Sequence, residues 1–88
     1  MRALGRVVAV TKTGRLVVRA DHAPPLGSRV YDERLTLVGE VYDIMGPVSS
    51  PYVSVKPLSK SLRLDSYMGK ILYVERARLR RKRRRRGK

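Results

Sequence analysis

The only histidine of the chain, His22, directly follows Asp21. A carboxylate beside an imidazole can orient a general base, as in hydrolases that activate a serine or cysteine nucleophile. No such nucleophile motif accompanies this pair, and the prolines that follow it at positions 24 and 25 predict a loop. We therefore expect His22 to be a solvent-exposed loop residue, and we expect no catalytic residue and no enzyme activity.

The seven carboxylates do not follow the spacing of a metal site. The chain has no Asp-x-Asp-x-Asp pattern and no second histidine, and it has no cysteine for a disulfide or for a cysteine-based zinc site. Asp32 and Glu33 are expected to form a solvated turn. The glycines match neither the Walker A nor the G-x-G-x-x-G spacing that cradles a phosphate. The sequence thus predicts no metal, no cofactor and no small-molecule substrate.

Positive charge is concentrated at the C-terminus. Residues 76–88 hold ten of the 21 lysines and arginines and none of the acidic residues, whereas residues 1–75 carry a net charge of only +4. Such a polycation attracts nucleic acid, and the absence of inserting apolar residues disfavours a membrane surface. RNA contacts are expected at Arg78, Arg80, Arg81, Lys82, Arg83, Arg84, Arg85, Arg86 and Lys88. Residues 75–81 are a candidate short helix once phosphates neutralise the arginines.

Alternation with a period of two residues dominates residues 1–75 and predicts short strands, although residues 5–10 and 36–44 are richer in valine on both faces. Leu16, Val18 and Ala20 share one face of such a strand, and Val53 and Val55 share one face of another. The expected strands cover residues 5–10, 15–20, 36–44, 52–56 and 71–74, with turns or loops at 12–14, 23–27, 31–34, 45–51 and 58–69. These five to six short strands predict an all-β fold, a small closed or nearly closed antiparallel barrel, over residues 1–75, followed by the basic tail 76–88.

Targeting signals are not evident in the sequence. No stretch approaches the roughly 20 apolar residues of a membrane-spanning helix. The first residues lack the ordered regions of a signal peptide. We expect a cytoplasmic protein with no membrane partner.

The predicted loop over residues 45–51 is apolar, although loops are usually polar so that they remain solvated. Two prolines, Pro47 and Pro51, restrict its backbone. An apolar, restricted loop is typical of a preorganised docking surface for another protein. Alternatively, Ile44, Met45 and Val48 fold inward and plug one end of the barrel, and for Met45 and Val48 the sequence does not decide between these two arrangements.

Tyr52 lies on the polar face of its predicted strand, which favours docking over burial. RNA-binding barrels also stack bases on exposed rings near basic side chains, and Tyr52 lies near Lys56 while Tyr73 lies near Lys70. Cross-strand packing explains tyrosines in strands equally well.

The segments around this loop resemble a known family. Val-Gly-Glu-Val-Tyr-Asp-Ile-Met-Gly-Pro-Val at residues 38–48 and Pro-Tyr-Val-Ser-Val-Lys-Pro at residues 51–57 resemble the core signature of the Gar subunit of H/ACA ribonucleoproteins. The first segment also resembles barrels of rotary ATPases and translation factors. The second segment narrows the resemblance to the Gar subunit. The resemblance extends over about residues 4–75.

The resemblance implies a six-stranded barrel without catalytic activity. Such a subunit binds the catalytic domain of a dyskerin-type pseudouridine synthase and assists loading and release of the rRNA substrate, while other subunits hold most of the H/ACA guide RNA. The docking residues it implies here are Met45, Gly46, Pro47, Val48, Pro51 and Tyr52, with Val53 and Val55 supporting them from the core.

The Gly-Arg-rich repeats of eukaryotic relatives are absent from this chain, which looks like the compact archaeal form. An RNA role for the tail therefore rests on charge alone. A free-standing RNA- or ribosome-binding barrel is the alternative function that the sequence leaves open.

Overall fold

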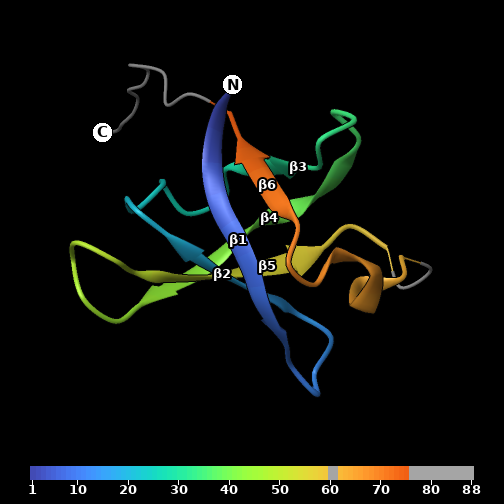
Figure 1. Ribbon diagram of the computed structural model, residues 1–88, viewed down its shortest axis with the longest axis horizontal. Helices are drawn as coiled ribbons and strands as arrows, with labels where there is room; N and C mark the ends of the chain where they lie inside the picture. The colour runs from blue at the N-terminus through green and yellow to red at the C-terminus, as the bar shows by residue number, and fades with distance from the viewer. Residues whose placement is uncertain (60–61, 76–88) are drawn as a thin grey trace, which may run out of the picture.

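In the computed structural model, which describes residues 1–59 and 62–75, the chain forms a closed antiparallel barrel (Figure 1). The order around the barrel is β1-β2-β5-β4-β3-β6. The strands are β1 (Arg2–Val10), β2 (Leu16–Ala20), β3 (Arg29–Tyr31), β4 (Leu37–Met45), β5 (Tyr52–Pro57) and β6 (Ile71–Val74), and a 3₁₀ helix η1 (Leu64–Tyr67) precedes β6. The predicted all-β, six-stranded barrel is confirmed.

Valine and leucine side chains fill the interior of the barrel. Leu16, Val18 and Ala20 point inward as their alternation predicts, and Val53 and Val55 are fully buried. Burying one such side chain stabilises the fold by about 1.5–3 kcal/mol relative to leaving it exposed. The rest of the buried apolar set is Leu4, Val7, Val30, Val38, Val41, Leu72 and Val74.

Two glycines stand where neighbouring strands approach closely. A β-carbon on Gly5 of β1 would overlap the carbonyl oxygen of Arg19 in β2, and one on Gly39 of β4 would overlap the carbonyl oxygen of Lys56 in β5. Backbone atoms cannot move aside as a flexible side chain can, so both positions require glycine for this barrel to close.

The shortest strand, β3, was not predicted, because three residues are too few to show alternation. Tyr31, expected to begin a polar turn, instead ends β3 and pairs with Leu37 of β4 and Tyr73 of β6. This strand closes the barrel by joining β4 to β6.

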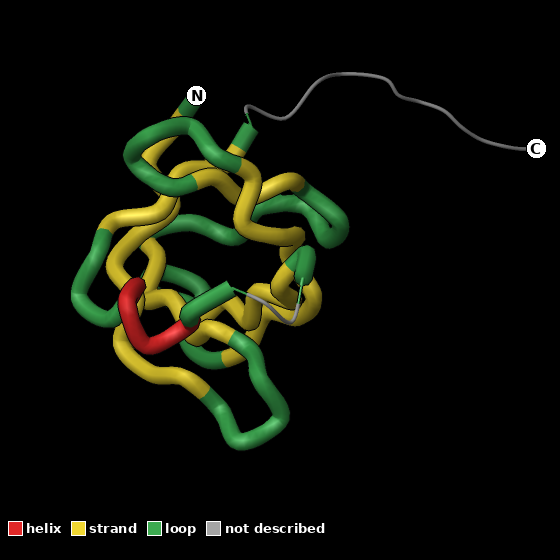
Figure 2. Tube along the Cα trace, turned by 90° about the vertical axis from the view of Figure 1, so that its right-hand side faces the viewer, coloured by secondary structure: helices red, strands yellow, loops and turns green. Residues whose placement is uncertain are grey.

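One end of the barrel is partly covered by η1. Figure 2 shows η1 in front of part of the ring of strands, and Leu64 and Tyr67 pack against the core. Within the described ranges, no helix is long and apolar enough to cross a membrane. The RNA-contact residues expected in the tail, and all but the first residue of the helix expected over 75–81, lie outside the described residues.

Candidate functional site

The β4–β5 hairpin extends away from the barrel, at the left of Figure 1. Met45, which was expected in the loop, ends β4 and pairs across the hairpin with Tyr52, the first residue of β5. Val48 in the connecting loop is 94% exposed, Met45 48% and Tyr52 37%. Met45 and Val48 therefore face solvent and do not plug the barrel, whereas Ile44 is half-buried against the core.

The far side of this loop is anchored to β2. The amide of Ala20 donates a 2.9 Å hydrogen bond to the carbonyl of Pro51, and Arg19 Nε donates to the Ser50 hydroxyl at 3.3 Å. The Ser50 amide also donates to the carbonyl of Pro47 at 3.2 Å, which closes a turn. These contacts restrain the loop before any partner binds.

Five of the six docking residues expected from the sequence are exposed on this hairpin. We call Met45, Gly46, Pro47, Val48 and Tyr52 the β4–β5 patch. Pro51 differs from the other five because it is less than 2% exposed. A buried proline cannot contact a partner, so the place of Pro51 is beneath the patch, where it fixes the loop against β2.

An exposed aromatic side chain on β4 escaped the sequence analysis. Tyr42 is 50% exposed, and the Arg15 guanidinium carbon lies 3.9 Å from the centre of its ring, a cation–π contact. The register of β4 against β5 shifts between Val41 and Asp43, so Tyr42 lies in a bulge. The tyrosine between Val41 and Asp43 was the one signal that the sequence offered. The β-bulge that places Tyr42 beneath Arg15 has no signature in the sequence.

The Asp21–His22 pair does form, with 2.7 Å between His22 Nδ1 and Asp21 Oδ1. The hydrogen bond from His22 lowers the pKa of the Asp21 carboxyl group. His22 lies in a loop as expected, but its side chain is only 19% exposed, so the expectation of a solvent-exposed histidine holds only in part. No serine or threonine hydroxyl of the described residues is hydrogen-bonded to this imidazole, so the pair is not part of a triad there.

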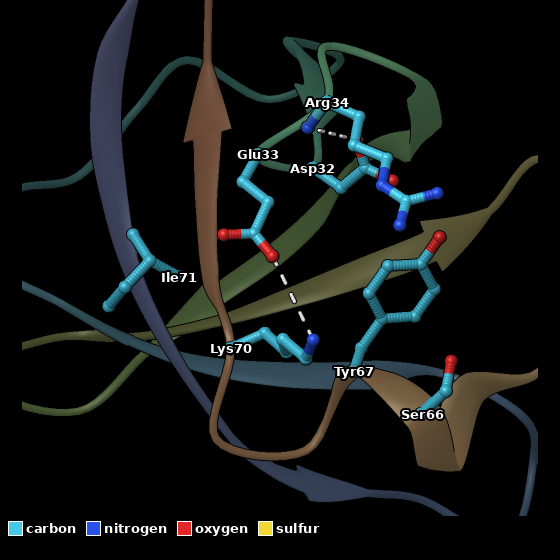
Figure 3. Close-up of a pocket in the computed structure, with 7 residues that line it drawn as sticks. All are labelled: Asp32, Glu33, Arg34, Ser66, Tyr67, Lys70 and Ile71. Carbon is cyan, nitrogen blue, oxygen red and sulfur yellow. Dashed lines mark hydrogen bonds and ion pairs between the residues drawn. The ribbon is translucent and has the colours of Figure 1, made fainter.

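A polar pocket of about 230 Å³ lies between the β3–β4 turn and η1 (Figure 3). The Asp32 carboxylate accepts hydrogen bonds from the amides of Arg34 and Thr36, at 2.9 and 3.0 Å. These bonds stabilise the turn, in which Leu35 has a φ of 64°. Asp32 therefore stabilises the turn between β3 and β4, as expected from the sequence.

Two other charged groups of this pocket, Lys70 and Glu33, form an ion pair. Lys70 Nζ lies 3.8 Å from Glu33 Oε1 (Figure 3). Burial of the Tyr67 ring is the main cause that raises the pKa of its phenol, and the nearby Asp32 carboxylate raises this pKa further. The described part of the chain contains no group of three or more His, Cys, Asp or Glu side chains that could hold a metal ion.

The described residues thus form a small closed β-barrel with an exposed apolar hairpin. The chain belongs to the Gar1/Naf1 RNA-binding-region family, whose model matches residues 1–84. It is also 37% identical over 77 residues to a Methanothermobacter thermautotrophicus protein described only as uncharacterized, a match that covers 84% of this chain and 83% of that protein. The family resemblance of residues 38–57 is thereby confirmed, and membership supports an RNA-binding role in a ribonucleoprotein.

Proposed function

We propose that this protein is a non-catalytic subunit of an H/ACA-type ribonucleoprotein, acting in the cytoplasm. It binds the dyskerin-type pseudouridine synthase subunit and assists RNA-guided pseudouridylation of rRNA by helping substrate load and leave. The observation that carries the proposal is the β4–β5 patch, in which Met45, Val48 and Tyr52 are exposed together on an anchored hairpin.

The patch has the properties of an interface core. Tyrosine and methionine are enriched at the centres of protein interfaces, where they bury large apolar areas. Binding costs free energy for every loop that must be ordered, and the bonds from Ala20 and Arg19 to the loop reduce that cost beforehand. We therefore expect the hairpin to dock with little change in backbone conformation.

An effect on catalysis requires no reacting group from this subunit. A bound protein shifts the equilibrium between open and closed active-site states by the difference between its affinities for the two. A preference of about 1.4 kcal/mol for one state changes the ratio of populations about tenfold. Such a shift would alter substrate loading and product release.

Charged substitutions in the patch test this proposal. Tyr52→Asp and Pro47→Asp in the full chain are expected to abolish co-purification with the synthase, because a buried unpaired carboxylate is costly. Circular dichroism and thermal unfolding should show an intact barrel for both variants. Unchanged co-purification would reject the proposal.

The alternative, a free-standing RNA- or ribosome-binding barrel, is favoured by the charge of residues 76–88. In that case phosphate contacts supply most of the affinity and weaken steeply with salt. Deleting residues 76–88 separates the two functions. Synthase binding retained after deletion supports the proposed subunit, whereas loss of all assembly supports the alternative; identifying the proteins and RNAs that co-purify from native cells gives an independent check.

A further inference from the structure

The outer surface of the barrel carries a groove at the end of β4 and β5 that lies away from the β4–β5 patch. The groove has a volume of about 420 Å³ and is lined where β4 begins and where β5 ends. This volume falls within the range of about 300–1,000 Å³ that is typical of small-molecule sites. No residue of the patch lines the groove, so the two surfaces are separate.

Apolar side chains form one part of the groove wall. Leu58 is 65% exposed, although its amide donates a 2.8 Å hydrogen bond to the carbonyl of Val38 that fixes the backbone at this point. Leu37 and Pro57, which are both half-buried, line the groove beside it. A restrained and exposed leucine at the edge of a groove is a surface that a flat ring covers favourably.

Charged side chains line the same groove in a row that crosses three strands. Glu40 of β4 is the register partner of both Arg29 in β3 and Lys56 in β5. All three side chains line the groove and are exposed. None of the ion pairs found among residues 1–59 and 62–75 includes any of them. The two cations outnumber the one carboxylate, and their N–H donors can therefore serve an anionic ligand.

The polycation of the chain begins at the rim of this groove. The amide of Glu75 donates a 3.3 Å hydrogen bond to the carbonyl of Arg29, and residues 76–88 with their ten lysines and arginines follow directly in the sequence. The Glu75 carboxylate accepts a 2.8 Å hydrogen bond from the Tyr31 hydroxyl. Linking two binding elements raises the effective concentration, at one element, of a ligand held by the other. RNA attracted by residues 76–88 is therefore presented to the groove at a raised effective concentration.

We infer that this groove binds one unstacked base of a single-stranded RNA, with Arg29 and Lys56 contacting the adjacent phosphates. Bases of single strands can be splayed out and packed against protein side chains, including apolar ones. Guanidinium and ammonium groups are common donors to the phosphates of the backbone.

RNA is favoured over an apolar side chain of a partner protein by three observations. The rim of the groove carries two cations, the polycation starts beside it, and the chain belongs to an RNA-binding family. The inference rests on the RNA-binding part of the proposed function and does not depend on synthase docking. A failure of synthase docking would leave the RNA affinities below unchanged, so the two proposals fail separately.

The test measures RNA binding by the full chain after separate loss of the apolar and of the charged contact. The probe is a fluorescein-labelled single-stranded RNA of about 12 nucleotides, followed by fluorescence anisotropy over a series of KCl concentrations. Leu58→Ser is expected to raise the Kd about fivefold, with an unchanged slope of log K against log salt because no charge is lost. Lys56→Gln is expected to raise the Kd about tenfold and to make this slope shallower by about 0.7, the value for one phosphate of a single strand.

The chain offers a matched control for each variant. Leu26 is also 65% exposed but lies in the loop before β3 and does not line the groove, so Leu26→Ser removes the same apolar surface elsewhere. Lys12→Gln removes the same charge from an exposed lysine in the turn between β1 and β2. Each control is expected to change the Kd less than about twofold.

Equal effects of a variant and its control would overturn the inference, because loss of exposed apolar surface or of net charge would then explain the result without the groove. Wild-type RNA affinity in Leu58→Ser together with weaker synthase binding would also overturn it, in favour of an apolar side chain of the partner protein.

A second measurement needs no substituted protein. The wild-type chain is crosslinked by ultraviolet light to the same RNA carrying 4-thiouridine, and the attached nucleotides are mapped by mass spectrometry. We expect crosslinks at Lys56, Pro57 or Leu58. Crosslinks confined to residues 76–88, or to parts of the barrel outside the groove, would contradict the inference.

Discussion

The ring of Tyr52 lies against Gly46, with its Cδ2 atom 3.2 Å from the point that a β-carbon on residue 46 would occupy. Gly46 has a φ of +91°, a conformation that other residues rarely adopt. Glycine therefore permits both the turn after β4 and the packing of the tyrosine ring over it. The two residues together set the shape of the β4–β5 patch.

Replacing Gly46 with alanine should damage docking more than stability. The left-handed conformation costs a residue with a β-carbon about 1–2 kcal/mol, and the Tyr52 ring must also move by a few tenths of an ångström. Gly14→Ala is the matched control, because Gly14 has a φ of +83° but nothing within 4 Å of its β-carbon position. Urea unfolding should give similar losses for both variants, whereas only Gly46→Ala should weaken synthase binding; equal binding by the two would contradict this role.

Substitutions at the close strand approaches should be far more damaging. In Gly5→Ala or Gly39→Ala the new methyl group meets a backbone carbonyl of the neighbouring strand, so strands must separate. We expect each variant to lose about 3 kcal/mol or more of unfolding free energy, or to fail to fold. Urea midpoints equal to that of Gly14→Ala would show that the strands can part without this cost.

The contact between Arg15 and Tyr42 predicts a measurable coupling. An exposed cation–π pair contributes about 0.5–1 kcal/mol. A double-mutant cycle with Arg15→Gln and Tyr42→Leu, followed by chemical unfolding, should give a coupling energy in this range. Additive losses would indicate that the 3.9 Å contact does not stabilise the fold.

Most of the barrel was predictable from the sequence because inward valines and leucines recur at every second residue along β2, β5 and β6. The features that the sequence did not predict depend on the register between neighbouring strands. Three-residue β3 has too little pattern, and the bulge at Tyr42 shifts which residues face each other. Ser54 alternates with the inward Val53 and Val55 and so belongs to the outer face of β5, yet it is buried between its register partners Val17 and Asp43.

The residues predicted to dock a partner show the same division: the sequence pattern predicts some of their properties, and the three-dimensional arrangement decides the others. Composition predicted an apolar loop, but the exposure of Met45 and Val48 follows from the projection of the hairpin, which no local pattern encodes. Pro51 looked like a surface residue because it belongs to the loop. Its burial follows from the bond between its carbonyl and Ala20 on a different strand.

Alkaline pH should reveal the environment of Tyr67. Its pKa in the folded chain is raised above the ordinary value of 10.0, so the folded state favours the neutral phenol. The associated stability is fully present below pH 10.0 and is lost as the pH rises from there through the raised pKa. The unfolding free energy should therefore fall less steeply above pH 10.0 in Tyr67→Phe than in the wild type, and parallel curves would contradict this assignment.

Synthase binding through the β4–β5 patch is the property on which the proposed function depends most. Val48 is 94% exposed, so Val48→Asp cannot disturb the barrel core, and Leu58→Asp, at a residue 65% exposed just beyond the other end of β5, is its matched control. The decisive measurement is the Kd of each full-length variant for the purified synthase. We predict at least about tenfold weaker binding for Val48→Asp, about 1.4 kcal/mol, and wild-type binding for Leu58→Asp. Wild-type affinity in Val48→Asp, or equal weakening in both variants, would contradict the central claim.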